Sequence, residues 1–491
     1  MFLGVDWLVL ILYLVASVFV GLWVSRGKKN FSDYMLGGGK IPWVAVGISI
    51  IATSVSATTF LGAPADVYAE DMTFLMFNIG AFISIFIVGY VFIPRFRGLS
   101  IVSAYELLEV HFSRGVRRVA AVFYSLHLIL RTGILLYAPS LVLSKILDIN
   151  IIYAILCSAI FATIYTWYGG IKAVIWTDVL QFVVFFVGGL FVLWLVADVV
   201  GGFGSLYSLA SNAGKTIWFN PSLNPGEART LISAGFAYAV LEVAIRGCDQ
   251  QFVQRYLSCS GAKEANKSSV LSMVLGVVVS LVFYWVGAAL FVYYQVVNHA
   301  KLPVGTDVNQ VFPHFILHGL PPGLTGLVVA AIFAAAMSSL SSAINALANT
   351  TEVDILGRDP QDPKSLGRAK IWTVLWATVG VVAAVIAAYA SGSLLQKALF
   401  FTGLFTGPLL AIFILSFFRP RTNPAVVIFA SVLGMFSLIL FNAVPVFPNY
   451  VPPFGKLLSW PWNPLISFSI AVISAVLIDF IIPRAKVNVT A

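Results

Sequence analysis

Apolar runs long enough to cross a lipid bilayer as α-helices recur from one end of the chain to the other. A helical span needs roughly 20 mostly apolar residues, and about thirteen segments of the 491-residue chain meet that requirement. Only 10% of the residues are charged, whereas about 25% is usual in soluble domains. We therefore expect an all-α polytopic membrane protein with spans near 5–25, 42–65, 72–94, 119–147, 151–169, 174–199, 230–254, 270–295, 323–350, 371–391, 395–418, 424–444 and 463–483.

Basic residues fall on every second loop between these spans. The other loops carry few of them, and the segment DVYAED (66–71) is acidic. Because basic loops stay on the cytoplasmic side, the alternation predicts an N-terminus outside and a C-terminus inside. The net charge of +9 is then a signal of topology rather than of nucleic-acid binding. The basic positions are 26–29, 95–118, Lys172, 255–267, 358–370, Arg419, Arg421, Arg484 and Lys486.

The sequence gives no sign of an enzyme, a disulfide framework or a cleaved leader. The motifs HExxH, GxSxG and Walker A do not occur. Cys157, Cys248 and Cys259 lie far apart and without metal-ligand spacing. The first apolar segment lacks a basic n-region and an AxA-type cleavage site, so we expect a retained span. The expected location is the cell membrane, with the lipid bilayer as a partner and no nucleic acid or obligate protein partner.

Two of the expected spans are interrupted. IATSVSATTFLGAP (51–64) breaks its apolar rhythm with small and hydroxylated residues, followed by Gly62 and Pro64. LEVAIRGCDQQFVQR (241–255) carries several charged and amide side chains at membrane depth. These are the second and seventh spans, and a separation of five gives two halves of opposite topology. Interrupted helices at matching positions of two halves point to a binding site near the membrane midplane of a transporter.

Four serines lie close together in the apolar segment 323–350, namely Ser338, Ser339, Ser341 and Ser342. On a period of 3.6 residues, one face of a helix carries Ala335, Ser338, Ser341 and Ser342, and Ser339 lies beside it. Intramembrane serines usually bond to the carbonyl one turn earlier or to a neighbouring helix. Clustered hydroxyls also form a surface of hard oxygen atoms, which suits Na⁺. The residues alone leave both interpretations open.

Asp178 lies about four residues into the expected span 174–199. An intramembrane carboxylate is a functional hypothesis by default, because burying it unpaired costs several kcal/mol. The structural alternative is an ion pair with Lys172 or with another basic loop residue.

Arg131 lies deep within the span 119–147, and no acidic residue lies within ten positions of it. A buried guanidinium must meet an acid on another helix or a bound anion. Glu242, Arg246 and Asp249 could form their own ion-pair network, or one of the acids could pair with Arg131. A structural ion pair and a clamp on a substrate carboxylate therefore remain equally open.

Six stretches, in this order and spacing, resemble the sodium/solute symporters. That family carries sugars, proline, pantothenate, monocarboxylates, sialic acid or iodide. The stretches are DYMLGGGKIPW (33–43), SVSATTFLGAPADVY (54–68), SAYELLEVHFSR (103–114), YGGIKAVIWTDVLQ (168–181), GCDQQFVQRYLS (247–258) and AAAMSSLSSAINA (334–346).

The resemblance implies one transporter domain over residues 1–491 with a fold of the leucine-transporter (LeuT) type. Such a fold has a five-plus-five inverted repeat. Its parts would be an extra N-terminal helix (1–30), a first repeat (42–200), a second repeat (230–418) and two extra C-terminal helices (424–483).

The resemblance also implies two sodium ions, each a coupling ion. The first site would use the carbonyls of Ala52, Val55 and Ala335 and the hydroxyls of Ser338 and Ser339. Some members have a second site, which here would consist of Asp178, Ser338, Ser341 and Ser342.

Substrate contacts follow from the same resemblance. The expected set lies on the two broken helices and on the third and fourth spans, and consists of Ser54, Ser56, Thr58, Thr59, Asn78, Arg131, Arg246 and Gln250. The chain departs from sugar carriers, because Thr58 and Thr59 replace a Glu-Gln pair and Ile245 replaces a gating tyrosine. Arg131 could hold a carboxylate through two parallel N–H···O bonds.

The sequence thus predicts a symporter that couples inward Na⁺ flux to uptake of a small organic solute, in particular a monocarboxylate or other organic anion. The alternatives are a sodium/proline or other amino-acid symporter and a proton-coupled carrier on the same fold. A membrane sensor or channel built on this fold is the rival from a different class.

Overall fold

The computed structural model describes residues 2–27, 30–55, 57–99, 101–297, 302–303, 306–389, 394–441, 453 and 457–481. Within these residues the regular structure is entirely helical. The α-helices are α1 Gly4–Val24, α2 Phe31–Leu36, α3 Trp43–Ser54, α4 Ala57–Ala69, α5 Phe77–Ile87, α6 Ile93–Arg97, α7 Glu106–His111, α8 Arg114–Leu147, α9 Ile151–Gly169, α10 Ile171–Val199, α11 Phe203–Asn212, α12 Tyr238–Cys248, α13 Gln250–Ser258, α14 Ala262–Phe291, α15 Val308–His318, α16 Leu324–Thr350, α17 Ser365–Tyr389, α18 Leu394–Phe418, α19 Pro424–Ser437 and α20 Asn463–Ile481.

Ten helices in the described part of the chain are long and apolar enough to cross a membrane. The number becomes eleven if Phe31–Gly39 and Trp43–Ser54, which are bent by 111°, count as one span. The expected segments 395–418 and 424–444 contain shorter apolar helices, Thr402–Phe418 and Pro424–Leu440. The all-helical, multi-pass architecture is therefore confirmed. The count of thirteen spans, the orientation of the termini and the repeat boundaries stay predictions.

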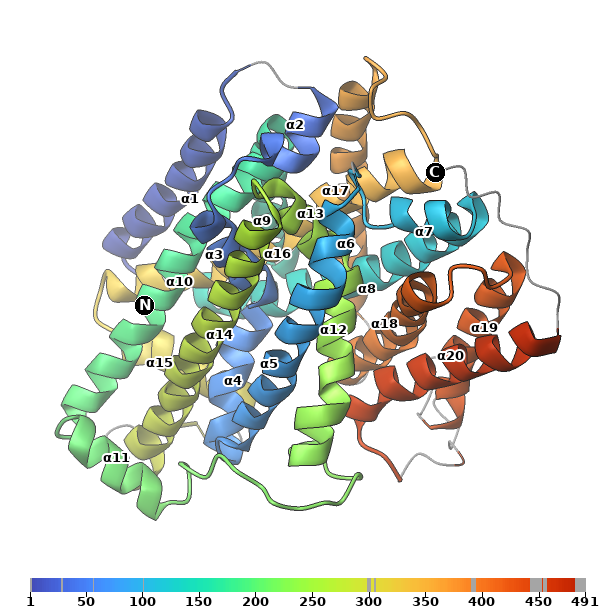
Figure 1. Cartoon of the computed structure of the whole chain (residues 1–491). Helices are drawn as coiled ribbons and strands as arrows, with labels where there is room; N and C mark the ends of the chain where they lie inside the picture. The colour runs from blue at the N-terminus through green and yellow to red at the C-terminus, as the bar shows by residue number, and fades with distance from the viewer. Residues whose placement is uncertain are drawn as a thin grey trace.

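Helix α16 forms the centre of the bundle (Figure 1). It packs against α1, α8, α9, α10 and α17, and 94% of its most apolar stretch is buried. Alanine and serine dominate its sequence, and small side chains of this kind let neighbouring helices approach closely. Helices α18, α19 and α20 pack on one another at one side of the molecule, and α1 lies on the other (Figure 1). The serine cluster consequently lies inside the protein and away from lipid.

Both expected helix breaks occur in the structure. Helix α3 ends at Ser54, and Val55 has an extended backbone with φ −87° and ψ 109°. Helix α12 ends at Cys248, and Asp249 is extended with φ −75° and ψ 123° before α13 begins. The Asp249 carboxylate accepts a hydrogen bond of 2.8 Å from the Gln251 amide, which satisfies one of the free N–H groups at the start of a helix. Each broken span thus supplies two half-helices with free backbone groups at the break.

Candidate cation and solute site

The serine face of α16 meets the end of α3 and the middle of α10. The Ser338 hydroxyl lies 3.0 Å from the Ala52 carbonyl oxygen and 2.8 Å from Asp178 Oδ1. The Ser339 hydroxyl donates to the Ala335 carbonyl at 3.2 Å, and the Ser341 hydroxyl donates to the Ser338 carbonyl at 3.1 Å. Ser338 thus connects α16 with α3 and α10.

A cavity of about 10 Å³ lies among these three helices. Four of the five residues predicted for the first sodium site line it: Ala52, Val55, Ala335 and Ser338. A volume of 10–15 Å³ holds one water molecule, and it therefore also suits a small ion. The remaining lining consists of Gln181, Phe182, Phe185 and Ala334.

The end of α3 brings residues of an incomplete last helical turn to this cavity. The carbonyls of a helix's last turn lack partners within the helix, and the break after Ser54 places such a turn beside α16. Carbonyl and hydroxyl oxygens are the ligands that hard cations prefer. Gln181 adds a side-chain oxygen, Oε1, which is buried and makes no hydrogen bond within the described residues. Sequence reasoning did not select Gln181, although it lies within the quoted WTDVLQ stretch.

The residues predicted for the second sodium site also lie together. The Asp178 carboxylate accepts hydrogen bonds from Ser338 at 2.8 Å and from Ser49 at 2.5 Å. The Ser342 hydroxyl lies 3.0 Å from the Thr53 hydroxyl. Asp178, Ser338, Ser341 and Ser342 are all at most 1% exposed. The structure therefore brings the four residues together in a buried polar cluster, while their role as ligands stays a prediction.

Asp178 forms an ion pair with Arg255, with 2.8 Å between the carboxylate oxygen and Nη2. The structural alternative for Asp178 is an ion pair with Lys172 or with another basic loop residue. Arg255 begins the basic segment 255–267, which the sequence places in an inner loop, but α13 continues to Ser258 and carries Arg255 into the interior. Removing one partner of such a buried pair typically costs 3–5 kcal/mol.

The residues expected to contact substrate on the first broken helix and on α5 are less buried. Ser54 donates to the Ile50 carbonyl at 3.0 Å, and Asn78 donates to the Leu75 carbonyl at 3.1 Å. Thr59 is exposed on α4. Ser56 and the side chain of Thr58 lie outside the described residues. Their assignment to a substrate site stays a prediction.

Arg246 and Gln250 make contacts of their own on the second broken helix. Arg246 is buried and pairs with Glu242 through Nε at 2.8 Å, as expected from the structural ion-pair alternative. The Gln250 side chain accepts from the Ala104 amide at 2.9 Å and donates to the Val102 carbonyl at 3.2 Å. Gln250 thus fastens the second broken helix to the loop before α7.

The role of Arg131 as the group that binds a substrate carboxylate stays a prediction. It is half-buried on α8 and makes no ion pair with the described acidic residues, and its charge acts on the Asp249 carboxylate at the second helix break. His127, one turn earlier, is 3% exposed, and neither ring nitrogen has a partner among the described residues. These two side chains place a cation and a free imidazole on the same stretch of α8.

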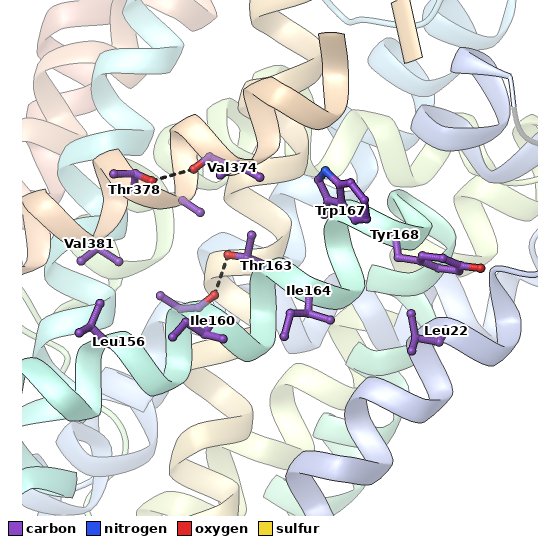
Figure 2. Close-up of a pocket in the computed structure, with 12 residues that line it drawn as sticks. Leu22, Leu156, Ile160, Thr163, Ile164, Trp167, Tyr168, Val374, Thr378 and Val381 are labelled. Carbon is purple, nitrogen blue, oxygen red and sulfur yellow. Dashed lines mark hydrogen bonds between the residues drawn. The ribbon is translucent and has the colours of Figure 1, made fainter. Parts of the chain in front are cut away.

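A larger groove lies away from this cluster, between α1, α9 and α17. Figure 2 shows the residues that line it, with Trp167 and Tyr168 toward one end. Its volume is about 540 Å³, and none of its lining side chains is charged. The hydroxyls of Thr163 and Thr378 are engaged by carbonyls of their own helices at 2.6 and 3.0 Å. The groove therefore offers mainly apolar surface and no charged group to pair with a charged solute.

Two broken helices, a cation-sized cavity at the first break and a buried carboxylate beside it define a class of protein. They are the features of a secondary transporter that binds its solute and coupling ion at discontinuous helices inside the bundle.

Comparison with known proteins identifies the family. Residues 34–434 match the sodium:solute symporter family, and the chain belongs to that family. It is a sodium-coupled symporter of the membrane rather than an enzyme, which confirms this part of the sequence prediction.

Several relatives are similar over most of their length. The chain is 32% identical to the sodium/sialic acid symporter SiaT of Proteus mirabilis, over 89% of each chain. It is 32% identical to sodium-coupled monocarboxylate transporter 1 of Mus musculus, over 85% of this chain and 70% of that one. Its structure also matches a substrate-bound, outward-open sodium-coupled sialic acid symporter described as having a novel Na⁺ site. That match has a TM-score of 0.88 and 29% identity, and it covers 99% of this chain and 100% of the other.

Proposed function

We propose that the protein couples the inward flux of two sodium ions to the uptake of a carboxylate-bearing solute of the sialic acid type. The observation that carries the substrate class is the match to sialic acid symporters in both sequence and structure. Sialic acid is an organic anion, so it satisfies the expectation of a solute with a carboxylate. This proposal names a narrower class of solute than the monocarboxylate or other organic anion that the sequence predicts.

Arg131 is the residue that we assign to the carboxylate. Its guanidinium is not held by an ion pair with the described acidic residues, and a guanidinium matches a carboxylate through two parallel hydrogen bonds. Arg246 is less suited to this task, because Glu242 already pairs with it.

Coupling follows from linkage between the ion and the solute. Sodium held by Ala52, Val55, Ala335, Ser338 and Ser339 would fasten the end of α3 to α16. That arrangement orders the break at which the solute contacts are expected. If sodium raises the affinity for the solute, the solute must raise the affinity for sodium by the same factor. Rocking of the bundle then exposes both to the inside.

Uptake into proteoliposomes tests the proposal. We expect accumulation of radiolabelled sialic acid with an inward sodium gradient and none when choline replaces sodium at fixed pH. Uptake that persists in choline and follows a proton gradient instead would support the proton-coupled alternative and contradict sodium coupling of this solute.

A competition series distinguishes the solute classes. Excess unlabelled sialic acid should abolish uptake, while proline and glucose should leave it unchanged. A small monocarboxylate is the second candidate substrate, because the monocarboxylate transporter of Mus musculus is as similar in sequence. Uptake of labelled lactate that sialic acid fails to reduce would favour this second candidate.

A further inference from the structure

Arg255 is among the largest fully buried side chains in the described part of the protein. Its Nη2 atom donates to Asp178 Oδ2 at 2.8 Å and to the Ser342 hydroxyl at 2.6 Å. Nε donates to the Ser49 hydroxyl at 2.8 Å, and Nη1 donates to the Gln251 carbonyl at 2.8 Å. One guanidinium thus joins α3, α10, α13 and α16.

Two of these acceptors are residues predicted for the second sodium site. A hard cation has its oxygen ligands roughly 2.3–2.6 Å away, and Nη2 lies only slightly farther from Asp178 and Ser342. A sodium ion that bridged the same two oxygens would lie against a positively charged nitrogen. Two like charges so close together in a buried site repel each other strongly. Sodium and the guanidinium therefore cannot both use these oxygens.

We infer that Arg255 is a tethered cation that competes with Na⁺ for Asp178 and Ser342, so that sodium enters the second site only by displacing the guanidinium. This inference rests on the proposed two-ion function. When sodium leaves, Arg255 returns to Asp178, and the buried carboxylate has a positive partner at each stage. An unpaired buried carboxylate would otherwise raise the free energy of the sodium-free carrier by several kcal/mol.

The exchange also connects the second site with both broken helices. Arg255 lies on α13, which follows the break at Asp249, and its bond to Ser49 fastens α13 to α3, which precedes the break at Val55. Release of Arg255 removes this bond together with the bond to α10. Sodium binding at Asp178 therefore weakens the attachment of one broken helix to the other.

The competing explanation is a permanent structural ion pair. In that case sodium binds elsewhere, and the charge at position 255 has no direct effect on sodium affinity. The two explanations predict different changes in sodium affinity when the charge of Arg255 is removed. Removing a competitor strengthens sodium binding, whereas removing a structural support does not.

The test is equilibrium binding of radioactive sodium to the purified full-length protein, without a transport assay. Arg255→Gln removes the charge, and we expect its half-saturating sodium concentration at the second site to fall at least about tenfold. Arg255→Lys keeps a charge that lacks the planar fork of arginine, and we expect a smaller fall. Arg117→Gln is the matched control, because Arg117 forms another ion pair with a fully buried acid, Asp354. We expect this variant to leave sodium binding unchanged.

Sodium affinity that is unchanged or weaker in both folded Arg255 variants would overturn the inference. If Arg255→Gln does not fold, the lysine variant alone decides by the same criterion. Asp178→Asn separates this failure from failure of the two-ion proposal. If Asp178→Asn binds one sodium ion fewer than the wild type, the two-ion proposal stands even where the inference about Arg255 fails. An unchanged number of bound ions would overturn both the two-ion proposal and the inference about Arg255.

Discussion

At the scale of single residues, the four serines of α16 have different roles. Ser338 contacts both α3 and α10, and Ser342 contacts Arg255 and Thr53. Ser339 and Ser341 bond to carbonyls of their own helix. The ordinary behaviour of intramembrane serines thus accounts for two hydroxyls, and the contacts between helices account for the other two.

Replacing Ser339 by alanine should weaken sodium binding with little change in the sodium-free protein. We expect the half-stabilising sodium concentration to rise about tenfold, which corresponds to the loss of one ligand worth roughly 1.4 kcal/mol. The measurement is the unfolding temperature as a function of sodium concentration.

Ser431→Ala is the control for this change. Ser431 is buried on α19 and bonds to the carbonyl four residues earlier at 2.8 Å, as Ser339 does at 3.2 Å. An equal loss of sodium response in both variants would show that the effect is structural and would remove Ser339 from the first site.

At the scale of elements, the break between α12 and α13 depends on Asp249. Asp249→Ala removes the cap of α13 and should lower the free energy of unfolding by about 0.5–2 kcal/mol. Asp249→Asn keeps an equally good capping side chain and should restore stability, while it removes the carboxylate on which Arg131 acts. The measurements are thermal unfolding and solute affinity of both variants. Equal destabilisation by alanine and asparagine would show that the charge, rather than the cap, maintains the break.

The helix α15, which packs on α4, should loosen as the pH falls. Burial lowers the pKa of His314, and the neighbouring His318 lowers it further. Because the pKa is lower in the folded protein, the unfolded segment takes up the proton first, near the ordinary value of about 6.5. Stability present above that pH is then lost below it. Hydrogen exchange of α15 measures this effect.

The bond between His314 Nδ1 and the Tyr294 hydroxyl, at 3.0 Å, is the contact expected to weaken. His314→Gln should make the protection factor of α15, which is the exchange rate corrected for its intrinsic dependence on pH, nearly constant between about pH 5 and 7.5. Acid-induced loosening that persists in this variant would contradict the assignment to His314.

At the scale of the whole molecule, the proposed stoichiometry predicts that uptake moves charge. Two sodium ions and one monoanion carry one net positive charge inward, worth about 2.3 kcal/mol per 100 mV. We therefore expect an inside-negative potential of about 100 mV to raise the equilibrium accumulation of solute roughly 50-fold over that at zero potential. Accumulation in proteoliposomes with the potential set by a potassium gradient and valinomycin measures this. Accumulation independent of the potential would indicate one sodium ion per anion.

The sequence by itself determined the membrane-spanning character and the two helix breaks. These features are local, because hydrophobic length, small or capping residues and helical period each act within one segment. The residues proposed for the first cation site came from the resemblance to the symporters, and four of them line one cavity in the structure: Ala52, Val55, Ala335 and Ser338.

Only the tertiary structure decided which groups meet across the bundle. Arg255 was one basic residue among several at the end of a span, and no periodicity along α13 indicates that it reaches Asp178 on α10. The packing of α13 against α16 and α3 buries Arg255, and a buried guanidinium must then take the nearest acid. The side-chain geometry within the bundle likewise decided that Arg246 pairs with Glu242. It also decided that Arg131 pairs with none of the described acids. Pairing of charges depends on which helices touch, and that depends on contacts between residues far apart in the chain.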